Sequence, residues 1–132
     1  MKKKTKSFPE SSYLLHFVCT KCCSSFKKYG LDPIDAKQVL ILKCAACEGP
    51  SYNCGRHFKP PKKEDSKQWE KVNLLISEGF WFQTVYEKNP ESGGFSRVEY
   101  PETMGEVLEF VQRFENDLER QYLKKAYKDS IS

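Results

Sequence analysis

Two C-x-x-C pairs constrain the fold of this chain more than any other feature. Cys19 and Cys22 form the first pair, Cys44 and Cys47 form the second, and 22 positions separate Cys22 from Cys44. Each pair directly follows a short apolar run, LLHFV before the first and VLILK before the second. A C-x-x-C turn directs two sulfurs to one side of the backbone, and four thiolates at about 2.3 Å suit tetrahedral Zn²⁺. The spacing therefore predicts a four-thiolate zinc site held between two short hairpins.

Further cysteines and a histidine leave the ligand set open. Cys54 and His57 form a C-x-x-H pair that begins seven residues after Cys47. An alternative set of four zinc ligands is therefore Cys44, Cys47, Cys54 and His57. A second zinc ion held by Cys23, Cys54 and His57, with His16 as the fourth candidate ligand, is a further alternative. Without a metal role, Cys54 and His57 would be a small buried thiol and a hydrogen-bonded imidazole. One zinc ion is expected, with two as the alternative.

His16 lies three residues before Cys19, an offset that places the two side chains on opposite faces of an extended strand. We therefore expect a hydrogen-bonded histidine at this position, not a ligand.

The start of the chain indicates the compartment. Residues 1–6 are basic like the beginning of a secretory signal, but Pro9 and polar residues follow, and the next apolar run is short and interrupted by His16. No apolar run approaches the roughly 18 residues that span a bilayer. We expect a cytoplasmic protein with reduced thiols and no membrane partner.

The segments FVCTKC and LKCAAC resemble the two knuckles of the zinc-ribbon superfamily, and the similarity covers about residues 13–58. It implies that Cys19, Cys22, Cys44 and Cys47 are the ligands. Proteins of this superfamily include transcription factors, RNA polymerase subunits, ribosomal proteins and phage or transposon proteins. The resemblance thus implies a module that binds nucleic acid or another protein. Cys23 and the Cys54/His57 pair depart from the pattern.

Composition divides the chain into two halves. Residues 1–65 carry 13 Lys and Arg against six Asp and Glu, a net charge of +7, whereas residues 66–132 have a net charge of −3. The clearest boundary is the segment KPPKKED, with two prolines and mixed charge. We predict a flexible basic arm at 1–12, a zinc-ribbon module at 13–58, a linker at 59–65 and an α+β unit at 66–132.

Within the first half, apolar patterning predicts strands at 13–18 and 38–43. Asp32 and Pro33 predict a helical turn at 33–37, and Gly49 and Pro50 predict a turn at 48–53. The segment between the first knuckle and this helical turn is expected to be a loop that carries Lys27, Lys28 and Tyr29.

The second half reads as helix, hairpin, helix. A helix is expected at 66–79, ending at Gly79, followed by strands at 80–86 and 95–100. Thr103 and Glu106 form a capping box for one helix at 104–126. The fold class is therefore α+β, with an N-terminal ribbon packed on a C-terminal αββα unit. The sparsely apolar end of the last helix is available to a partner or to a second copy in a homodimer.

The sequence leaves two candidate functions. Neither H-E-x-x-H nor the H-x-E and P-C-x-x-C pair of zinc deaminases occurs, so we expect no enzyme. The first function is contact with nucleic acid, or with a nucleic-acid machine, through the basic half. The alternative is a protein adaptor or inhibitor with structural zinc that binds through its aromatic hairpin and acidic C-terminal helix. The basic candidates for the first function are Lys27, Lys28, Arg56, Lys59, Lys62 and Lys63.

Overall fold

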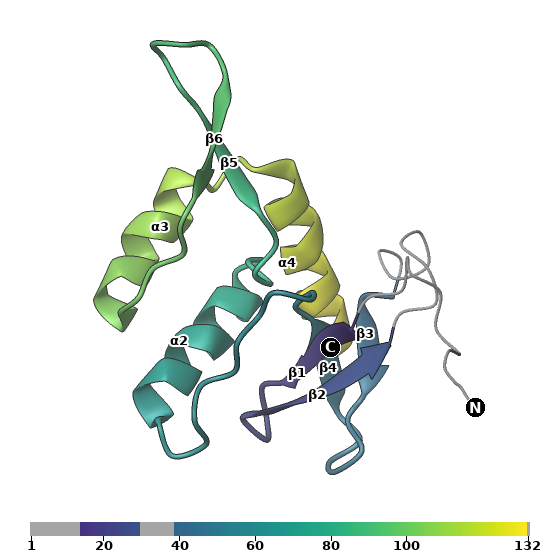
Figure 1. The fold of residues 1–132 in the computed structure, drawn as a ribbon. Helices are drawn as coiled ribbons and strands as arrows, with labels where there is room; N and C mark the ends of the chain where they lie inside the picture. The colour runs from purple at the N-terminus through teal and green to yellow at the C-terminus, as the bar shows by residue number, and fades with distance from the viewer. Residues whose placement is uncertain (1–13, 30–38, 132) are drawn as a thin grey trace, which may run out of the picture. The chain divides into compact units, whose positions relative to one another are not determined.

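The computed structural model describes residues 14–29 and 39–131 and divides the chain into two compact units, Met1–Glu64 and Asp65–Ser132 (Figure 1). The expected arm at 1–12 and helical turn at 33–37 lie outside the described residues. No helix among the described residues has the length and apolar character needed to cross a bilayer.

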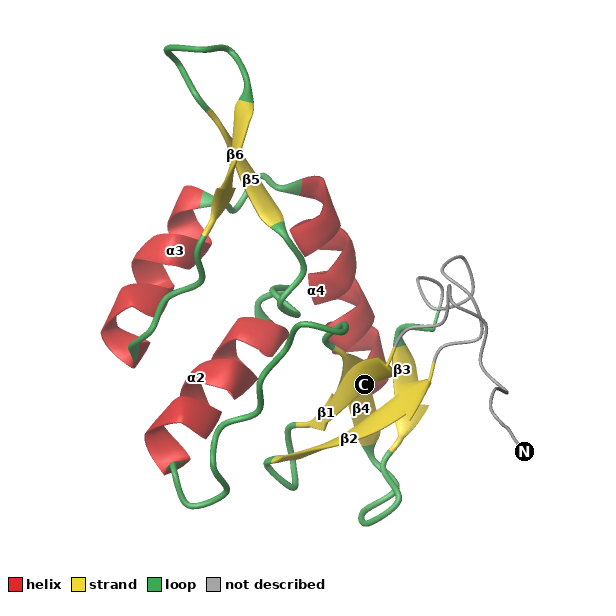
Figure 2. Cartoon of the chain, viewed as in Figure 1, coloured by secondary structure: helices red, strands yellow, loops and turns green. Residues whose placement is uncertain are grey.

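The first unit contains one four-stranded antiparallel sheet. Its strands are β1 (Leu14–Cys19), β2 (Ser24–Tyr29), β3 (Ile41–Lys43) and β4 (Pro50–Asn53). They lie in the order β2-β1-β4-β3, so the apolar strand β1 is central (Figure 2). Two tight turns, one between β1 and β2 and one between β3 and β4, carry the two cysteine pairs.

Side chains on both faces of β1 are buried, because the strand is apolar at nearly every position. On one face Phe17 pairs directly with Phe26 of β2, and the two rings stack with centroids 5.6 Å apart. On the other face Val18 pairs with Tyr52 of β4, and neither side chain is exposed. Burial on both sides fixes the register of β1, since a shift by one residue would exchange its two faces.

Two of these strands correct the expectation from sequence. Lys27, Lys28 and Tyr29 lie in strand β2 instead of a loop, because Phe26 is enough to attach an otherwise polar segment to the edge of the sheet. The expected turn at 48–53 contains strand β4 from Pro50 onward. Pro50 is tolerated because it is the first residue of its strand.

The second unit begins with helix α2 (Ser66–Ser77), close to the predicted helix. The Asp65 carboxylate accepts a hydrogen bond from the Gln68 N–H at 3.3 Å and caps the helix. Gly79, with a φ of 90°, follows the helix end, which confirms the expected glycine stop.

The hairpin is confirmed, but its first strand begins later than expected. Strand β5 covers Val85–Lys88 and pairs with β6 (Phe95–Val98). Residues 80–83 instead make an irregular connection, in which Phe82 has a φ of 64°. The Gln83 side chain closes this connection by accepting from the Trp81 N–H at 2.6 Å and donating to the Gly79 carbonyl at 3.0 Å.

The single helix expected at 104–126 is wrong. The structure has a 3₁₀ turn, η2 (Met104–Glu106), then α3 (Val107–Arg113) and α4 (Leu118–Ile131). Helix α3 ends at Arg113 with Phe114 as its C-cap. Asp117 starts α4, because its carboxylate accepts from the Arg120 N–H at 3.0 Å as an N-cap does.

The core of this unit is aromatic and gathers residues from its helices and from the hairpin. Phe110 lies at its centre, with ring centroids 4.9 Å from Phe80, 5.1 Å from Tyr100 and 5.1 Å from Phe114. Arg120 is buried beside it, 5.5 Å from the Phe80 ring, and pairs with the Glu78 carboxylate at 2.8 Å. These contacts attach α4 to the end of α2.

Candidate metal centre

Strand register brings the two cysteine pairs to the same end of the sheet. Cys19 is the last residue of β1 and lies opposite Ser51, near the start of β4. Since the strands are antiparallel, the turn that leaves β1 and the turn that enters β4 meet at this edge. Cys22 lies in the first turn, and Cys44 and Cys47 lie in the second.

The four sulfurs form a compact cluster. All four Sγ atoms lie within 4.8 Å of one another. The Cys19 and Cys47 sulfurs are 3.5 Å apart, and those of Cys22 and Cys44 are 4.0 Å apart. Tetrahedral zinc with Zn–S bonds of about 2.3 Å separates its sulfurs by about 3.8 Å. The sulfur positions therefore fit one tetrahedral ion.

Backbone N–H groups inside each turn point at the sulfurs. The Cys22 N–H donates to the Cys19 sulfur at 3.4 Å, and the Gly49 N–H donates to the Cys47 sulfur at 3.4 Å. Hydrogen bonds from the Cys47 and Ala46 N–H groups lower the pKa of the Cys44 thiol to about 6. The backbone N–H groups of the two turns thus place partial positive charge next to the sulfurs, and this charge is present without a bound cation.

Two of the thiols in the cluster, Cys19 and Cys22, have a raised pKa and so ionise less readily. Hydrogen bonding with the Cys47 and Cys19 thiols raises the pKa of Cys22 to about 12, and burial is the main cause of the raised pKa of Cys19. Four thiolates at this spacing repel each other, and a bound cation is the group that offsets their charge and lowers their pKa values. The donor set is therefore suited to a thiophilic divalent cation.

A left-handed residue follows each C-x-x-C pair directly. Cys23 has a φ of 50° and Glu48 a φ of 63°, in a region that costs a non-glycine residue about 1–2 kcal/mol. The conformation at Glu48 turns the chain so that the next N–H, that of Gly49, reaches a sulfur. A Cβ added at Gly49 would lie 3.4 Å from the Cys47 sulfur, which is ordinary van der Waals contact.

The additional candidate ligands lie outside this cluster. The Cys23 sulfur is 3.7 Å from the Thr20 carbonyl, Cys54 is buried with a pKa raised by that burial, and His57 is exposed. Among the described residues, no group of three or more candidate ligands gathers besides the four-cysteine cluster. The alternative tetrad of Cys44, Cys47, Cys54 and His57 is therefore not assembled.

At His16 the expected hydrogen bond is missing at one ring nitrogen, Nδ1, among the described residues. Its side chain is buried, and no hydrogen-bond partner for Nδ1 is found in the described part of the chain. The ring instead meets Phe58 edge-on, with centroids 6.1 Å apart. Burial, and then the charge of Lys27, lower the pKa of His16, so the neutral imidazole is favoured.

The basic candidates lie on two segments of the first unit. Lys27 pairs with His16 and Lys28 with Leu15, so the two lysines point to opposite faces of edge strand β2. They do not form one basic pair, as a loop would have allowed. The remaining candidates are exposed residues after β4: Arg56, Lys59, Lys62 and Lys63.

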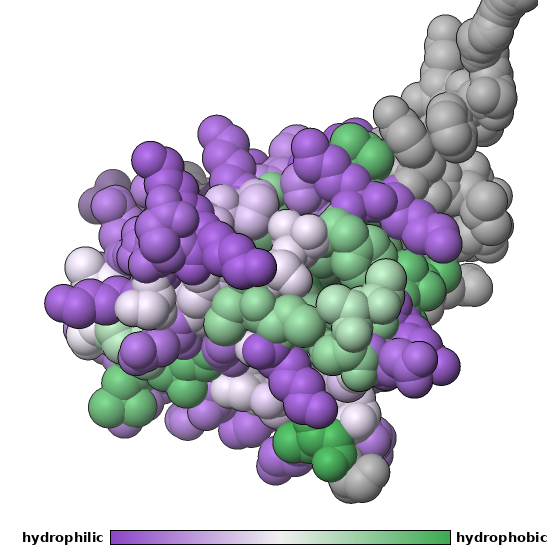
Figure 3. All heavy atoms as spheres, turned by 90° about the horizontal axis from the view of Figure 1, so that it is seen from below, coloured by the Kyte–Doolittle hydropathy of each residue, from purple (hydrophilic) through white to green (hydrophobic). Residues whose placement is uncertain are grey.

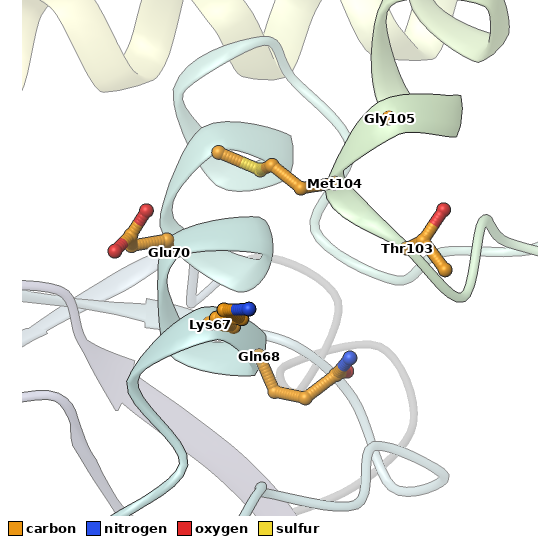
Figure 4. A pocket seen from close by; sticks show the side chains of 6 residues that line it. All are labelled: Lys67, Gln68, Glu70, Thr103, Met104 and Gly105. Carbon is orange, nitrogen blue, oxygen red and sulfur yellow. The ribbon is translucent and has the colours of Figure 1, made fainter.

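The second unit contains a groove of about 500 Å³ between the first turns of α2 and η2 (Figure 4). The Thr103 hydroxyl at its rim donates to the Glu106 carboxylate at 2.9 Å, so it belongs to the capping box. The groove is lined by Lys67, Gln68, Glu70, Thr103, Met104 and Gly105.

Comparison of the chain with protein-family models, with curated proteins and with solved structures found no match.

Proposed function

We propose that the four-cysteine cluster holds one structural Zn²⁺ in a ribbon-like module. The observation that carries this proposal is the approach of four sulfurs from two turns to within 4.8 Å. A closed set of four thiolates is typical of structural zinc sites, whereas catalytic sites keep a position open for water. The ion would join the β1–β2 turn to the β3–β4 turn, so its main effect is to stabilise the sheet.

The metal is tested by native mass spectrometry of the full reduced chain, with Cys44→Ser and Cys54→Ser as matched variants. We expect one zinc per chain in the wild type and in Cys54→Ser, and its loss in Cys44→Ser. Two zinc ions, or loss of metal in Cys54→Ser, would contradict the single four-cysteine site. A visible absorption band with bound iron would correct the identity of the metal.

We further propose that the first half of the chain, residues 1–65, contacts nucleic acid. Its net charge of +7 and the exposed cations after β4 support this proposal. Lysine and arginine that neutralise phosphates release counterions, and this release provides most of the sequence-independent affinity for nucleic acid. Lys59, Lys62 and Lys63 flank two prolines, which keep their segment extended and suited to lie along a backbone.

Salt dependence tests this contact. Binding of the full metal-loaded chain to labelled nucleic acid should weaken as salt increases. The triple variant Lys59→Gln, Lys62→Gln and Lys63→Gln should reduce the slope of log K against log salt by about 0.7–0.9 per lost phosphate contact. The control variant Lys67→Gln with Lys128→Gln removes two exposed cations of the second unit and should leave the slope unchanged. Equal slopes for the wild type and the triple variant would contradict the proposal.

A protein partner is the second candidate, and it is favoured by two exposed residues of α4. Leu118 is 79% exposed and Tyr122, one helical turn later, is 63% exposed. Figure 3 colours the surface by hydropathy and shows hydrophobic residues among hydrophilic ones. Light scattering of wild type and Tyr122→Lys tests this candidate, since a homodimer through α4 would dissociate in the variant.

A further inference from the structure

The outer face of the β5–β6 hairpin carries two aromatic and two cationic side chains. Tyr86 pairs with Arg97, and Lys88 pairs with Phe95. Directly opposed residues share a face and alternate residues of a strand return to it, so these four lie together. Tyr86 is 60% exposed and Phe95 is 70% exposed. The hairpin extends beyond α3 and α4 of its own unit in Figure 1.

The alternate residues account for the opposite face of the hairpin. Val85 pairs with Val98; the first is buried in the aromatic core and the second packs against it. Glu87 lies on this inner face, where Arg113 of α3 donates to its carboxylate from Nε at 2.9 Å. The inner face therefore attaches the hairpin to the unit, and attachment does not explain the exposed rings on the outer face.

Charge on the outer face differs from that of its surroundings. The second half has a net charge of −3, yet the charged residues of this face within the two strands are Lys88 and Arg97. Glu87, the carboxylate of β5, is on the inner face and is ion-paired with Arg113. Glu91 in the turn and Glu99 after β6 lie outside the strand pairing. The outer face thus presents two positive charges beside two rings.

We propose that the outer hairpin face binds single-stranded nucleic acid by stacking bases on Tyr86 and Phe95, with Lys88 and Arg97 contacting phosphates. This inference rests on the proposed function for its class of ligand, and adds a second contact surface. The two rings are diagonal neighbours, and such positions are about 7–8 Å apart, which gives each ring its own base on an extended strand. Each nucleotide of a single strand offers a flat base and a negatively charged phosphate, and alternating rings and cations match these two groups.

A protein surface fits this face less well. The four side chains include no aliphatic residue, and one of the two cations is Lys88, a residue type that is depleted in protein interfaces relative to the rest of the surface. On the hairpin, a cation is directly opposite each ring, so no apolar centre free of charge exists among these four residues.

The test is fluorescence anisotropy of a labelled single-stranded 12-mer with the full metal-loaded chain, compared with a duplex of the same sequence. We expect Tyr86→Leu with Phe95→Leu to weaken binding of the single strand about tenfold or more. Tyr86→Phe with Phe95→Tyr preserves both rings and should keep wild-type affinity. Tyr122→Leu removes an exposed ring elsewhere in the unit and should have no effect.

The outcomes separate this inference from the proposed function. In one outcome, the Leu variant binds as tightly as the wild type while the triple lysine variant binds more weakly. That result would overturn binding by the hairpin face and would leave the proposed contact through the first half standing. Absence of wild-type binding overturns both. Equal loss for single strand and duplex overturns base stacking, as does binding of a protein by the same face. Ultraviolet crosslinking of the wild type should join bases to Tyr86 or Phe95, and crosslinks confined to the first unit would also overturn the inference.

Discussion

Gly79 lies at a position in the second unit where the backbone of α4 leaves no space for a side chain. It has a φ of 90°, and a Cβ added there would lie 2.1 Å from the Arg120 carbonyl oxygen and 2.9 Å from the Lys124 nitrogen. These atoms belong to the backbone of α4 and cannot move aside as a flexible side chain would. Glycine thus permits both the end of α2 and the close approach of α4.

Gly79→Ala should therefore lower the free energy of unfolding of the second unit by about 2–4 kcal/mol, from combined overpacking and backbone strain. Urea unfolding followed by fluorescence of Trp69 and Trp81 measures this change. Gly93→Ala is the matched control: its φ is 76°, but nothing lies within 4 Å of an added Cβ. The control should lose only about 1–2 kcal/mol, and equal losses would contradict the close approach.

At the scale of elements, the capping box at η2 makes the stability contributed by this helix start depend on pH. The Thr103 N–H and hydroxyl both donate to Glu106, at 3.2 Å and 2.9 Å. These bonds favour the carboxylate, so the pKa of Glu106 is lowered from its ordinary value. A lowered pKa adds stability above the unfolded-state pKa of about 4.3, and that stability is lost as the pH falls through the folded-state pKa.

Thr103→Ala should raise the pKa of Glu106 toward its ordinary value and destabilise the unit at pH 7. The difference in stability from wild type should diminish as the pH falls below about 4, because protonated Glu106 no longer benefits from the bonds. Carboxyl NMR titration measures the pKa directly. Thr103→Ser retains the hydroxyl and should keep the lowered pKa; an unchanged pKa in Thr103→Ala would refute this assignment.

Element boundaries were predicted where local chemistry dominates and missed where tertiary contacts decide. The Gly79 stop was predicted from sequence, since a glycine ends a helix through its own backbone conformation. Strand β2 was missed because SSFKKY is mostly polar, and the segment becomes a strand by pairing with β1. The break before α4 did have a signal, Asn116-Asp117, which a continuous apolar stripe obscured.

The candidate metal site was more predictable than its surroundings. Spacing alone brought Cys19, Cys22, Cys44 and Cys47 together as candidates, because C-x-x-C geometry is local. The left-handed conformations of Cys23 and Glu48 had no sequence signal, since glycine is the residue expected there. The unpartnered Nδ1 of His16 likewise depends on packing that no local pattern encodes.

At the scale of the whole molecule, the two units differ in what stabilises them. The first has a small sheet and a proposed zinc ion, and structural zinc commonly supplies about 10–16 kcal/mol of coupled folding energy. The second has an aromatic core gathered from α2, α3, the hairpin and the connections beside them. We infer that the metal is needed by the first unit alone.

Chelation of the full chain should therefore unfold the first unit and leave the second folded. Hydrogen exchange should show loss of amide protection in β1 and β4, with protection in α2 and α4 retained. Fluorescence of Trp69 and Trp81, both in the second unit, should change little. Restoring zinc should restore protection in β1. Simultaneous loss of protection in both units would contradict separate stabilisation.

The buried thiol of Cys54 has a practical consequence. Its side chain is 2% exposed and lies in the metal-bearing unit but outside the four-sulfur cluster, whereas Cys23 is half-buried. Alkylation kinetics should thus divide the six cysteines into three classes: Cys23 modified first, four released with the metal, and Cys54 modified only when the sheet opens. Mass spectrometry of a timed labelling reaction would then record metal loss and unfolding as separate events in one experiment.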